Sequence, residues 1–377
     1  MSLLYKLDKI DDIIWSKKVV LQKGEYQYKF KVDGEWVEDS FNTTKIEDDK
    51  GAWNSFLNLG SVEDVLKNQV DEKLKSRKDI DFIGFYEKDK SRREFIQSEL
   101  NINSYSELDN LLEKCNAVTI ATPTIFHYEV AKLAMDFDCH VFIEKPITHT
   151  VEEAESLLLQ AEKLNKFIQV GHIEQFNSAL TAIDFTNINP MFIEAHRLSP
   201  FPGRGIDVPV VLDLMIHDIG IVLSIVHSEV KDIKAFGQSV VSDTTDLANA
   251  RIEFENGCVV NLTTSRVSLK KMRKMRIFQH HRYLTIDYLN RIVDDYHSFD
   301  DEPENKPNQT TYTIDGPRKK FIQYDNVEVD QSDALSTEFD HFIQTIQTDN
   351  NTGYSGEEAT KALKLAIEIQ NIIEKSD

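Results

Sequence analysis

The sequence predicts an α/β protein with a doubly wound parallel sheet, followed by a domain with a mostly antiparallel sheet and preceded by a small all-β segment. Strands and helices alternate between residues 79 and 172, which is typical of a parallel sheet with crossover helices. Residues 190–330 instead contain consecutive strand-like runs around one apolar helix. Residues 1–60 contain short alternating runs separated by turn residues.

Composition limits the possible functions. The chain has 377 residues, 41% of them hydrophobic, which is enough for two or three domains with cores of their own. Its net charge of −21 disfavours nonspecific binding to nucleic acid or anionic membranes, because both require a basic surface. No apolar run approaches the about 20 residues of a membrane span, and no signal-peptide core is visible at the N-terminus. Three widely spaced cysteines favour buried thiols in a reducing compartment over metal ligands or a disulfide, so we expect a cytoplasmic protein without a metal site.

The first 78 residues divide into a β-rich part, 1–60, and a charged helix or linker, 61–78. The run 26–32 alternates aromatic or apolar residues with polar ones, as a half-buried strand does. Asp33-Gly34 predicts a hairpin turn before the next strand. Strands are expected at 17–21, 26–32, 35–37 and 53–59.

Residues 79–175 form the expected parallel-sheet domain. Thr150 and Glu153 make a capping-box pattern, after which apolar residues recur at helical spacing. Strands are expected at 81–86, 117–121, 140–143 and 167–170, with helices near 89–100, 106–114, 125–137 and 151–165.

Residues 176–377 form the second expected domain. One apolar helix is expected at 209–226, and the acidic, proline-containing segment 294–309 predicts an exposed loop. Two helices close the chain, at 336–347 and 356–375, the second behind the capping-box pattern Ser355-Gly356-Glu357-Glu358.

Polar residues follow the predicted parallel strands at their carboxyl ends, where open α/β sheets bind ligands. Glu144-Lys145-Pro146 follows the strand 140–143, Thr122-Pro123-Thr124 with His127 follows 117–121, and Gly171-His172 follows 167–170. In isolation, Glu-Lys-Pro would be a solvated turn. The convergence of three such segments on one edge favours a ligand site instead.

Asp213 and His217 stand four residues apart on the predicted helix 209–226. On one helical face a carboxylate can orient and polarise an imidazole. The alternative is a polar stripe on a core helix, and the two residues alone do not decide between these interpretations.

Together these motifs resemble the Gfo/Idh/MocA oxidoreductases, from about residue 79 to the C-terminus. The resemblance implies a Rossmann domain followed by an open-faced, mostly antiparallel sheet that binds substrate and mediates homo-oligomerisation. It implies catalytic roles for Lys145, Asp213 and His217. It places the cofactor against Glu87, Thr122, Pro123, Thr124, His127, Glu144, Lys145, Pro146, Gly171 and His172, and the substrate against Asn177, Arg197, Asp213 and His217.

The resemblance also indicates the ligands. Glu87 stands where an acid of the family binds the adenosine ribose, and its charge disfavours the 2′-phosphate of NADP, so NAD is the expected cofactor. The segment 171–177 resembles members that act on UDP-N-acetylhexosamines. We therefore expect hydride transfer between NAD and a hydroxyl of a sugar or sugar nucleotide.

One departure from the family is marked, because the Gly-x-Gly-x-x-Gly turn that holds the pyrophosphate is missing. Gly60 is solitary, Gly84 is expected inside a strand, and Gly203-Arg204-Gly205 lies in the second half. The nucleotide domain is thus N-terminally incomplete, and impaired cofactor binding is expected. The alternative function is that of a catalytically impaired or vestigial dehydrogenase with a carbohydrate-binding role.

Residues 23–36 resemble the glycogen-binding module of AMP-activated kinase β subunits and branching enzymes. The resemblance implies that Trp36 stacks on a glucose ring while Lys29 and Asn54 donate hydrogen bonds. A tryptophan in a small β-domain can instead belong to its core. The first strands of this module are also missing, so a natural fusion, a gene rearrangement or an assembly error would each explain the pattern.

Overall fold

The computed structural model forms two compact units, Met1–Phe82 and Ile83–Asp377, which we describe separately. In residues 1–58 the structure describes only the backbone of seven short strands. Beyond them it describes Leu74 and residues 77–201, 208–304, 309–316, 318–350 and 353–375.

The strands of the first unit are paired antiparallel. The predicted hairpin is confirmed, because Val32 pairs with Glu35 across a two-residue connection. Of the predicted strand 26–32, the part before Lys29 pairs with β7 and the part after it pairs with β5. Residues 17–21, Lys29 and the side chains of Trp36 and Asn54 lie outside the described residues. The strands are β1 (Asp8–Lys9), β2 (Trp15–Ser16), β3 (Glu25–Tyr28), β4 (Phe30–Val32), β5 (Glu35–Val37), β6 (Lys45–Glu47) and β7 (Trp53–Asn58).

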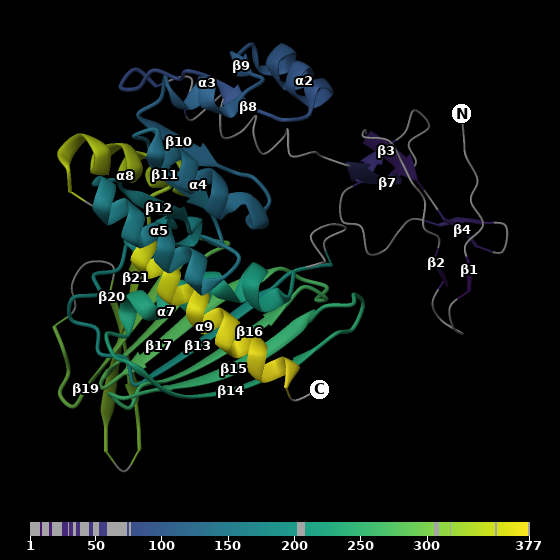
Figure 1. Ribbon diagram of the computed structural model, residues 1–377. Coiled ribbons are helices and arrows are strands. Elements are labelled where there is room, and N and C mark those ends of the chain that lie inside the picture. Colours follow the sequence, from purple (N-terminus) through teal and green to yellow (C-terminus); the bar gives the residue numbers. More distant parts are fainter. Residues whose placement is uncertain are drawn as a thin grey trace. The chain divides into compact units, whose positions relative to one another are not determined.

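The second unit begins with the predicted parallel layer (Figure 1), in which β10 (Ala117–Ile120), β11 (His140–Glu144) and β12 (Ile168–Gly171) pair in that order. β8 (Phe85–Tyr86) and β9 (Ser104–Tyr105) form a separate parallel pair. The βαβ alternation is therefore confirmed. Its helices are α2 (Lys90–Leu100), α3 (Leu108–Leu112), the 3₁₀ turn η1 (Thr124–Phe126) leading into α4 (His127–Asp136), and α5 (Val151–Leu164).

The predicted strand 81–86 is shorter than expected, and Gly84 precedes it rather than lying within it. Gly84 has a φ of +146°, which L side chains rarely adopt. A Cβ at this position would lie 2.4 Å from the Asn103 carbonyl oxygen. The glycine thus allows the chain to pass close to the backbone that precedes β9.

The second layer is a nine-stranded sheet in the order β14-β15-β16-β13-β17-β18-β19-β21-β20. Only the pair β13–β16 is parallel, which confirms the mostly antiparallel prediction. The strands are β13 (Phe192–Leu198), β14 (Val230–Gln238), β15 (Leu247–Phe254), β16 (Val259–Ser265), β17 (Met272–Gln279), β18 (Arg282–Asp287), β19 (Ile292–Phe299), β20 (Gln309–Ile314) and β21 (Lys320–Val327).

Helices cover one face of this sheet (Figure 1). The apolar segment 209–226 is helical as predicted, but it starts with a π-helical turn, η3 (Val211–Met215), before α7 (Ile216–Ile225). The capping boxes at Thr150 and Ser355 are both present. The remaining helical elements are η2 (Ile173–Phe176), α6 (Ser178–Thr181), α8 (Ala334–Thr348) and α9 (Gly356–Glu374).

The predicted acidic loop 294–309 is wrong in its first part, which belongs to β19. Its acidic side chains have partners on neighbouring strands: Asp295 accepts hydrogen bonds from Arg282 on β18, and Asp294 accepts one from the Tyr324 hydroxyl on β21. Paired carboxylates of this kind are compatible with a strand, whereas composition alone favours a loop.

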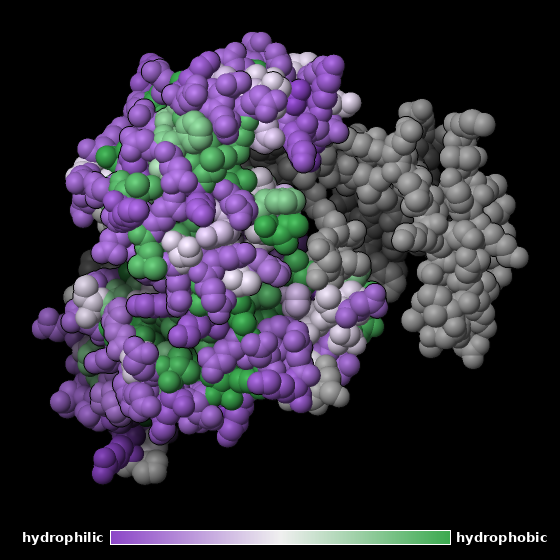
Figure 2. All heavy atoms as spheres, viewed as in Figure 1, coloured by the Kyte–Doolittle hydropathy of each residue, from purple (hydrophilic) through white to green (hydrophobic). Residues whose placement is uncertain are grey.

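The surface in Figure 2 is predominantly hydrophilic, in keeping with the high fraction of charged residues. Within the part of the chain that the structure describes, no helix has both the length and the apolar character needed to cross a membrane.

Candidate functional site

Lys145 and Asp213 connect the two layers of the second unit. The Lys145 ammonium, just beyond β11, donates hydrogen bonds to Asp213 Oδ1 at 2.8 Å and to the Asp213 carbonyl oxygen at 2.7 Å. Both side chains are partly accessible, at 23% and 32%. The carboxyl edge of the parallel sheet therefore meets the helical segment of the second layer, with a cation and an anion available to a ligand.

The partner of Asp213 differs from the sequence-based expectation. From the sequence, its carboxylate could either orient His217, four residues later on the same helix, or belong with it to a polar stripe. The carboxylate instead contacts Lys145, and His217 Nδ1 is buried without a hydrogen-bond partner. An ammonium provides a full charge-assisted bond, which is stronger than a bond to a neutral imidazole. Asp213 lies in the π-helical turn, a local irregularity that is frequent at functional sites.

His217 and His172 form a buried pair beside this contact. Their rings meet edge to face with centroids 5.8 Å apart, and their exposed fractions are 9% and 1%. Burial, followed by the nearby Lys145 charge, lowers the pKa of His172 to about 3 and lowers the pKa of His217 well below its ordinary value. Both imidazoles are therefore neutral near pH 7.

His127 joins two loops of the carboxyl edge. Its Nδ1 lies 2.9 Å from the Pro146 carbonyl oxygen and its Nε2 lies 2.8 Å from the Thr122 carbonyl oxygen. The side chain is 1% exposed, so the ring positions the loops rather than presenting an edge to a ligand. Thr122 Oγ1 is buried without a partner, and Pro123 and Thr124 begin the η1 turn.

Arg197 is committed to a buried ion network. Its guanidinium donates to both oxygens of Asp218, at 2.9 and 2.8 Å, and to Glu174 Oε1 at 3.3 Å. With an exposed fraction of 3%, it holds β13, η2 and α7 together and has no open face for a substrate. Arg273, 2.7 Å from Glu174 Oε1 and 42% exposed, is the accessible cation of this network. Sequence reasoning missed Glu174, Asp218 and Arg273.

The other expected site residues lie at the ends of their elements. Asn177 caps α6 and donates to the Tyr288 carbonyl oxygen at 3.3 Å. Gly171 ends β12, where a Cβ would lie 3.0 Å from Glu144 Oε2, so the glycine allows a close approach to the end of β11. Glu87 follows β8, and its Oε1 accepts a hydrogen bond from the Asp89 amide at 3.0 Å.

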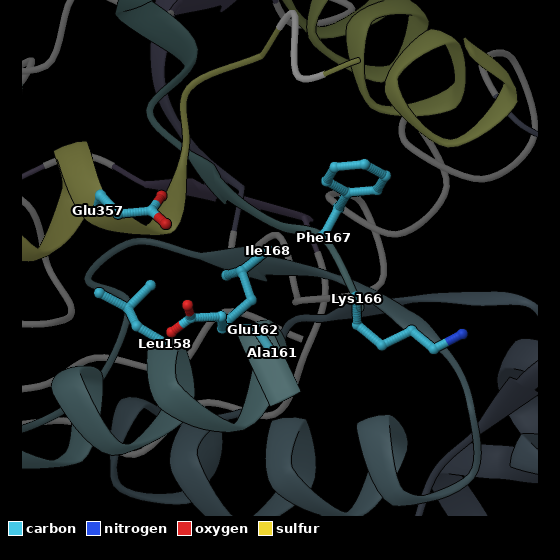
Figure 3. A pocket seen from close by; sticks show the side chains of 7 residues that line it. All are labelled: Leu158, Ala161, Glu162, Lys166, Phe167, Ile168 and Glu357. Atoms are coloured by element: carbon cyan, nitrogen blue, oxygen red, sulfur yellow. The ribbon is translucent and has the colours of Figure 1, made fainter. Parts of the chain in front are cut away.

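A cavity of about 300 Å³ lies at the opposite edge of the parallel sheet (Figure 3). It includes residues 166–168, where β12 begins, whereas Lys145 follows the carboxyl end of β11. Lys166 extends away from Glu162 in Figure 3 and pairs with Asp138 at 2.6 Å. This cavity is therefore separate from the Lys145 site. Its lining residues are Leu158, Ala161, Glu162, Lys166, Phe167, Ile168 and Glu357.

Two further buried groups near the site carried no signal in the sequence. Tyr354 packs on His172 with ring centroids 4.6 Å apart, and its hydroxyl has no partner. Glu338 on α8 is 1% exposed. Burial and the charge of Glu144 raise the pKa of Glu338 well above its ordinary value. Among the residues that the structure describes, no group of three His, Cys, Asp or Glu side chains is placed to hold a metal ion.

The fold and this site define a dinucleotide-dependent oxidoreductase with a nucleotide-binding layer and a substrate layer. The chain belongs to the GFO/IDH/MocA oxidoreductase family: residues 65–172 match its NAD-binding Rossmann fold and residues 183–282 match a C-terminal domain of the family. NAD is accordingly the expected cofactor.

Known proteins agree with this assignment. The UDP-N-acetylglucosamine 3-dehydrogenase of Acidithiobacillus ferrooxidans is 32% identical over 292 residues, which cover 77% of this chain and 89% of that protein. Its crystal structure superposes with a TM-score of 0.70 and covers 78% of this chain and 90% of that chain. An Agrobacterium radiobacter oxidoreductase, solved with NAD⁺, L-tartaric acid and magnesium, shares the fold at 14% identity, with a TM-score of 0.64 over 78% of this chain and 88% of that one.

Proposed function

We propose that this chain is a sugar-nucleotide dehydrogenase that oxidises a ring hydroxyl of a UDP-N-acetylhexosamine with NAD. The observation that carries the proposal is the Lys145–Asp213 contact beside the neutral His217. The substrate class is supported by the 32% identical UDP-N-acetylglucosamine 3-dehydrogenase and by segment 171–177. In this proposal residues 79–175 bind the nucleotide and residues 176–377 bind the substrate.

The roles of the side chains follow from their charges. His217 is neutral and takes the proton of the substrate hydroxyl as a general base. Lys145 donates a hydrogen bond to the reacting oxygen and stabilises the negative charge that develops there. Asp213 holds the ammonium in place from the second layer. NAD, when bound, supplies the hydride acceptor.

The carboxyl edge of the parallel sheet fits the nicotinamide half of NAD. Thr122 Oγ1 is a buried polar atom without a partner at this edge, and Gly171 keeps the backbone free of a side chain beside Glu144. Glu87, at the end of β8, would bind the adenosine ribose hydroxyls and disfavour NADP. His127, Pro146 and Arg197 then act by positioning their neighbours.

The turn that would hold the pyrophosphate is not found in the sequence, so we propose that these 377 residues bind NAD weakly. A loss of about 3–4 kcal/mol corresponds to several hundred-fold in affinity. Calorimetric titration with NAD tests this, alongside a chimera in which residues 1–78 are replaced by a strand and a Gly-x-Gly-x-x-Gly turn. The chimera should bind more tightly, and micromolar binding by the unaltered chain would refute the proposal.

The catalytic roles are tested by NADH formation with UDP-N-acetylglucosamine. Lys145→Met and His217→Ala should each lower kcat by about 10²-fold or more, the scale of acid–base groups. Matched controls are Lys166→Met, at the opposite sheet edge, and His227→Ala, exposed beyond α7. Turnover near wild type in either test variant would exclude its role. A wild-type chain that binds a glucan but neither binds NAD nor turns over would support the vestigial alternative.

We further propose that residues 1–60 bind a glucan through Trp36, Lys29 and Asn54. The β4–β5 hairpin, which carries Trp36 opposite Lys31, supports the likeness to a glycogen-binding module. Co-sedimentation with glycogen tests this. Trp36→Ala should abolish retention if the ring stacks on glucose, whereas unchanged retention would contradict that role.

Self-association through the nine-stranded sheet is also part of the proposal. Five half-buried aromatic rings cross neighbouring strands, with successive centroids 4.6 to 5.7 Å apart. Aromatic residues are enriched at the centres of protein interfaces. The rings are Phe192, Phe278, Tyr283, Tyr296 and Tyr324, with Tyr283 in the centre. Tyr283→Lys should lower the particle mass measured by light scattering if this face is an interface.

The three free cysteines are compatible with a cytoplasmic location.

A further inference from the structure

Several buried polar atoms on and beside His217, the proposed base, do not form hydrogen bonds with one another. His172 Nδ1, Gln175 Nε2, Tyr354 Oη and His217 Nδ1 are all buried and have no hydrogen-bond partner. His172 lies at the end of β12, Gln175 in η2, His217 in α7 and Tyr354 in the segment before α9. The Tyr354 backbone is fixed to β12, because its carbonyl oxygen accepts a hydrogen bond from the Val170 amide at 3.1 Å.

Gly220 on α7 marks the point where three of these atoms converge. A Cβ at Gly220 would lie 2.9 Å from Tyr354 Oη, 3.3 Å from Gln175 Nε2 and 3.3 Å from His172 Nδ1. An unsatisfied buried polar group costs about 1–3 kcal/mol, so leaving three of them unpaired is expensive. A buried water typically makes about 2–4 hydrogen bonds to such groups.

We propose that buried water against Gly220 joins Tyr354, Gln175 and His172 into a hydrogen-bonded cluster, and that this cluster positions His217. His172 lies between the two ends of the cluster, since its ring centroid is 4.6 Å from that of Tyr354 and 5.8 Å from that of His217. His172, Gln175 and Tyr354 are thus positioning residues. Their consequence for catalysis rests on the proposed function, whereas the cluster itself does not.

The charged groups around His217 make no hydrogen bond to its Nδ1 in the structure. Lys145, Arg197 and Arg273 face it as cations and cannot accept its proton. Asp213 is bonded to Lys145 and Asp218 is bonded to Arg197. In the proposed arrangement His217 carries its proton on Nδ1, which is buried without a partner in the structure, donates it to the cluster, and leaves Nε2 as the base.

The cluster is tested without substrate by NMR of the full chain labelled with ¹⁵N-histidine. We expect the Nδ1–H tautomer for His217, and we expect Tyr354→Phe to shift the ring nitrogen resonances of both His172 and His217. The control is Tyr128→Phe, which removes a hydroxyl that contacts Ser156 on the surface. Gly220→Ala should cause similar shifts, because its Cβ would lie 2.9–3.3 Å from the three polar atoms and exclude a water bound among them. Unchanged resonances in Tyr354→Phe, or the Nε2–H tautomer, would overturn the inference.

The catalytic consequence is tested with NAD and UDP-N-acetylglucosamine. Without the cluster, the imidazolium formed on His217 loses an acceptor. Tyr354→Phe should therefore lower kcat by about 10-fold, leave KM unchanged and move the acid limb of the pH profile to lower pH. A change in KM alone would contradict positioning. If the wild-type chain shows no turnover, the proposed function fails, and the NMR experiment still decides whether the cluster exists.

Discussion

His172 predicts a steep loss of stability in acid. Its ring is 1% exposed, and burial, followed by the Lys145 charge, lowers its pKa to about 3. In the unfolded chain an ordinary histidine has a pKa of about 6.5. Between these two values the unfolded state binds a proton that the folded state does not, so stability falls as the pH decreases.

The magnitude follows from the two pKa values. Each pH unit below about 6.5 costs close to 1.4 kcal/mol for one proton, which reaches about 3 kcal/mol at pH 4. Glutamine cannot take up a proton in this range. His172→Gln should lower the free energy of unfolding near pH 7.5, because the glutamine amide fits the site less well than the imidazole. Between pH 7 and 4, however, the variant should lose less stability than the wild-type chain.

Urea unfolding at pH 7.5, 6, 5 and 4, followed by circular dichroism, measures this difference. The comparison uses the change in unfolding free energy with pH, from which any pH-independent cost of the substitution cancels. His227→Gln, at an exposed position, is the matched control and should leave the wild-type slope unchanged. If His172→Gln and the wild-type chain lose stability in parallel, His172 is not buried as a neutral ring.

Two further predictions concern ion pairs. Asp213→Asn should lower kcat by at least about tenfold. It should leave the fold intact, since a partly exposed pair with Lys145 contributes about 1 kcal/mol or less to stability. A wild-type kcat in a steady-state assay would contradict the role of Asp213. Arg266→Met should lower the free energy of unfolding by about 3–5 kcal/mol, because it removes the cation paired with the buried Asp246 carboxylate, which keeps only its hydrogen bonds from residues 240–242. The exposed Arg251→Met should change it by less than about 1 kcal/mol, and chemical denaturation measures both.

Local sequence predicted the elements that depend on local chemistry. The capping boxes at Thr150 and Ser355 form because a hydroxyl and a carboxylate three residues apart satisfy free amides. The strand before Glu144 was predictable because a short apolar run fits a strand buried on both faces. The position of Lys145 then followed from topology, since parallel strands end at one edge.

Contacts between distant segments could not be predicted in this way. For Asp213 the sequence offered a partner only one helical turn away, but a lysine from another layer provides the stronger bond. Arg197 was expected to face the substrate, but Asp218 and Glu174 enclose it. Tyr354 reaches His172 from 182 residues further along the chain, and no spacing rule covers such a distance.

Helix α9 explains why the two layers keep a fixed geometry at the site. Ala359 and Leu363 belong to the core beside the parallel sheet, whereas Ala362, Ala366 and Ile369 belong to the core of the antiparallel sheet. One helix thus contributes to both cores and holds the layers that carry the lysine and the aspartate of the site. Residues 83–377 should therefore unfold in a single transition, with coincident curves from fluorescence and circular dichroism. Two separated transitions within this unit would show that the layers are independent and that α9 does not couple them.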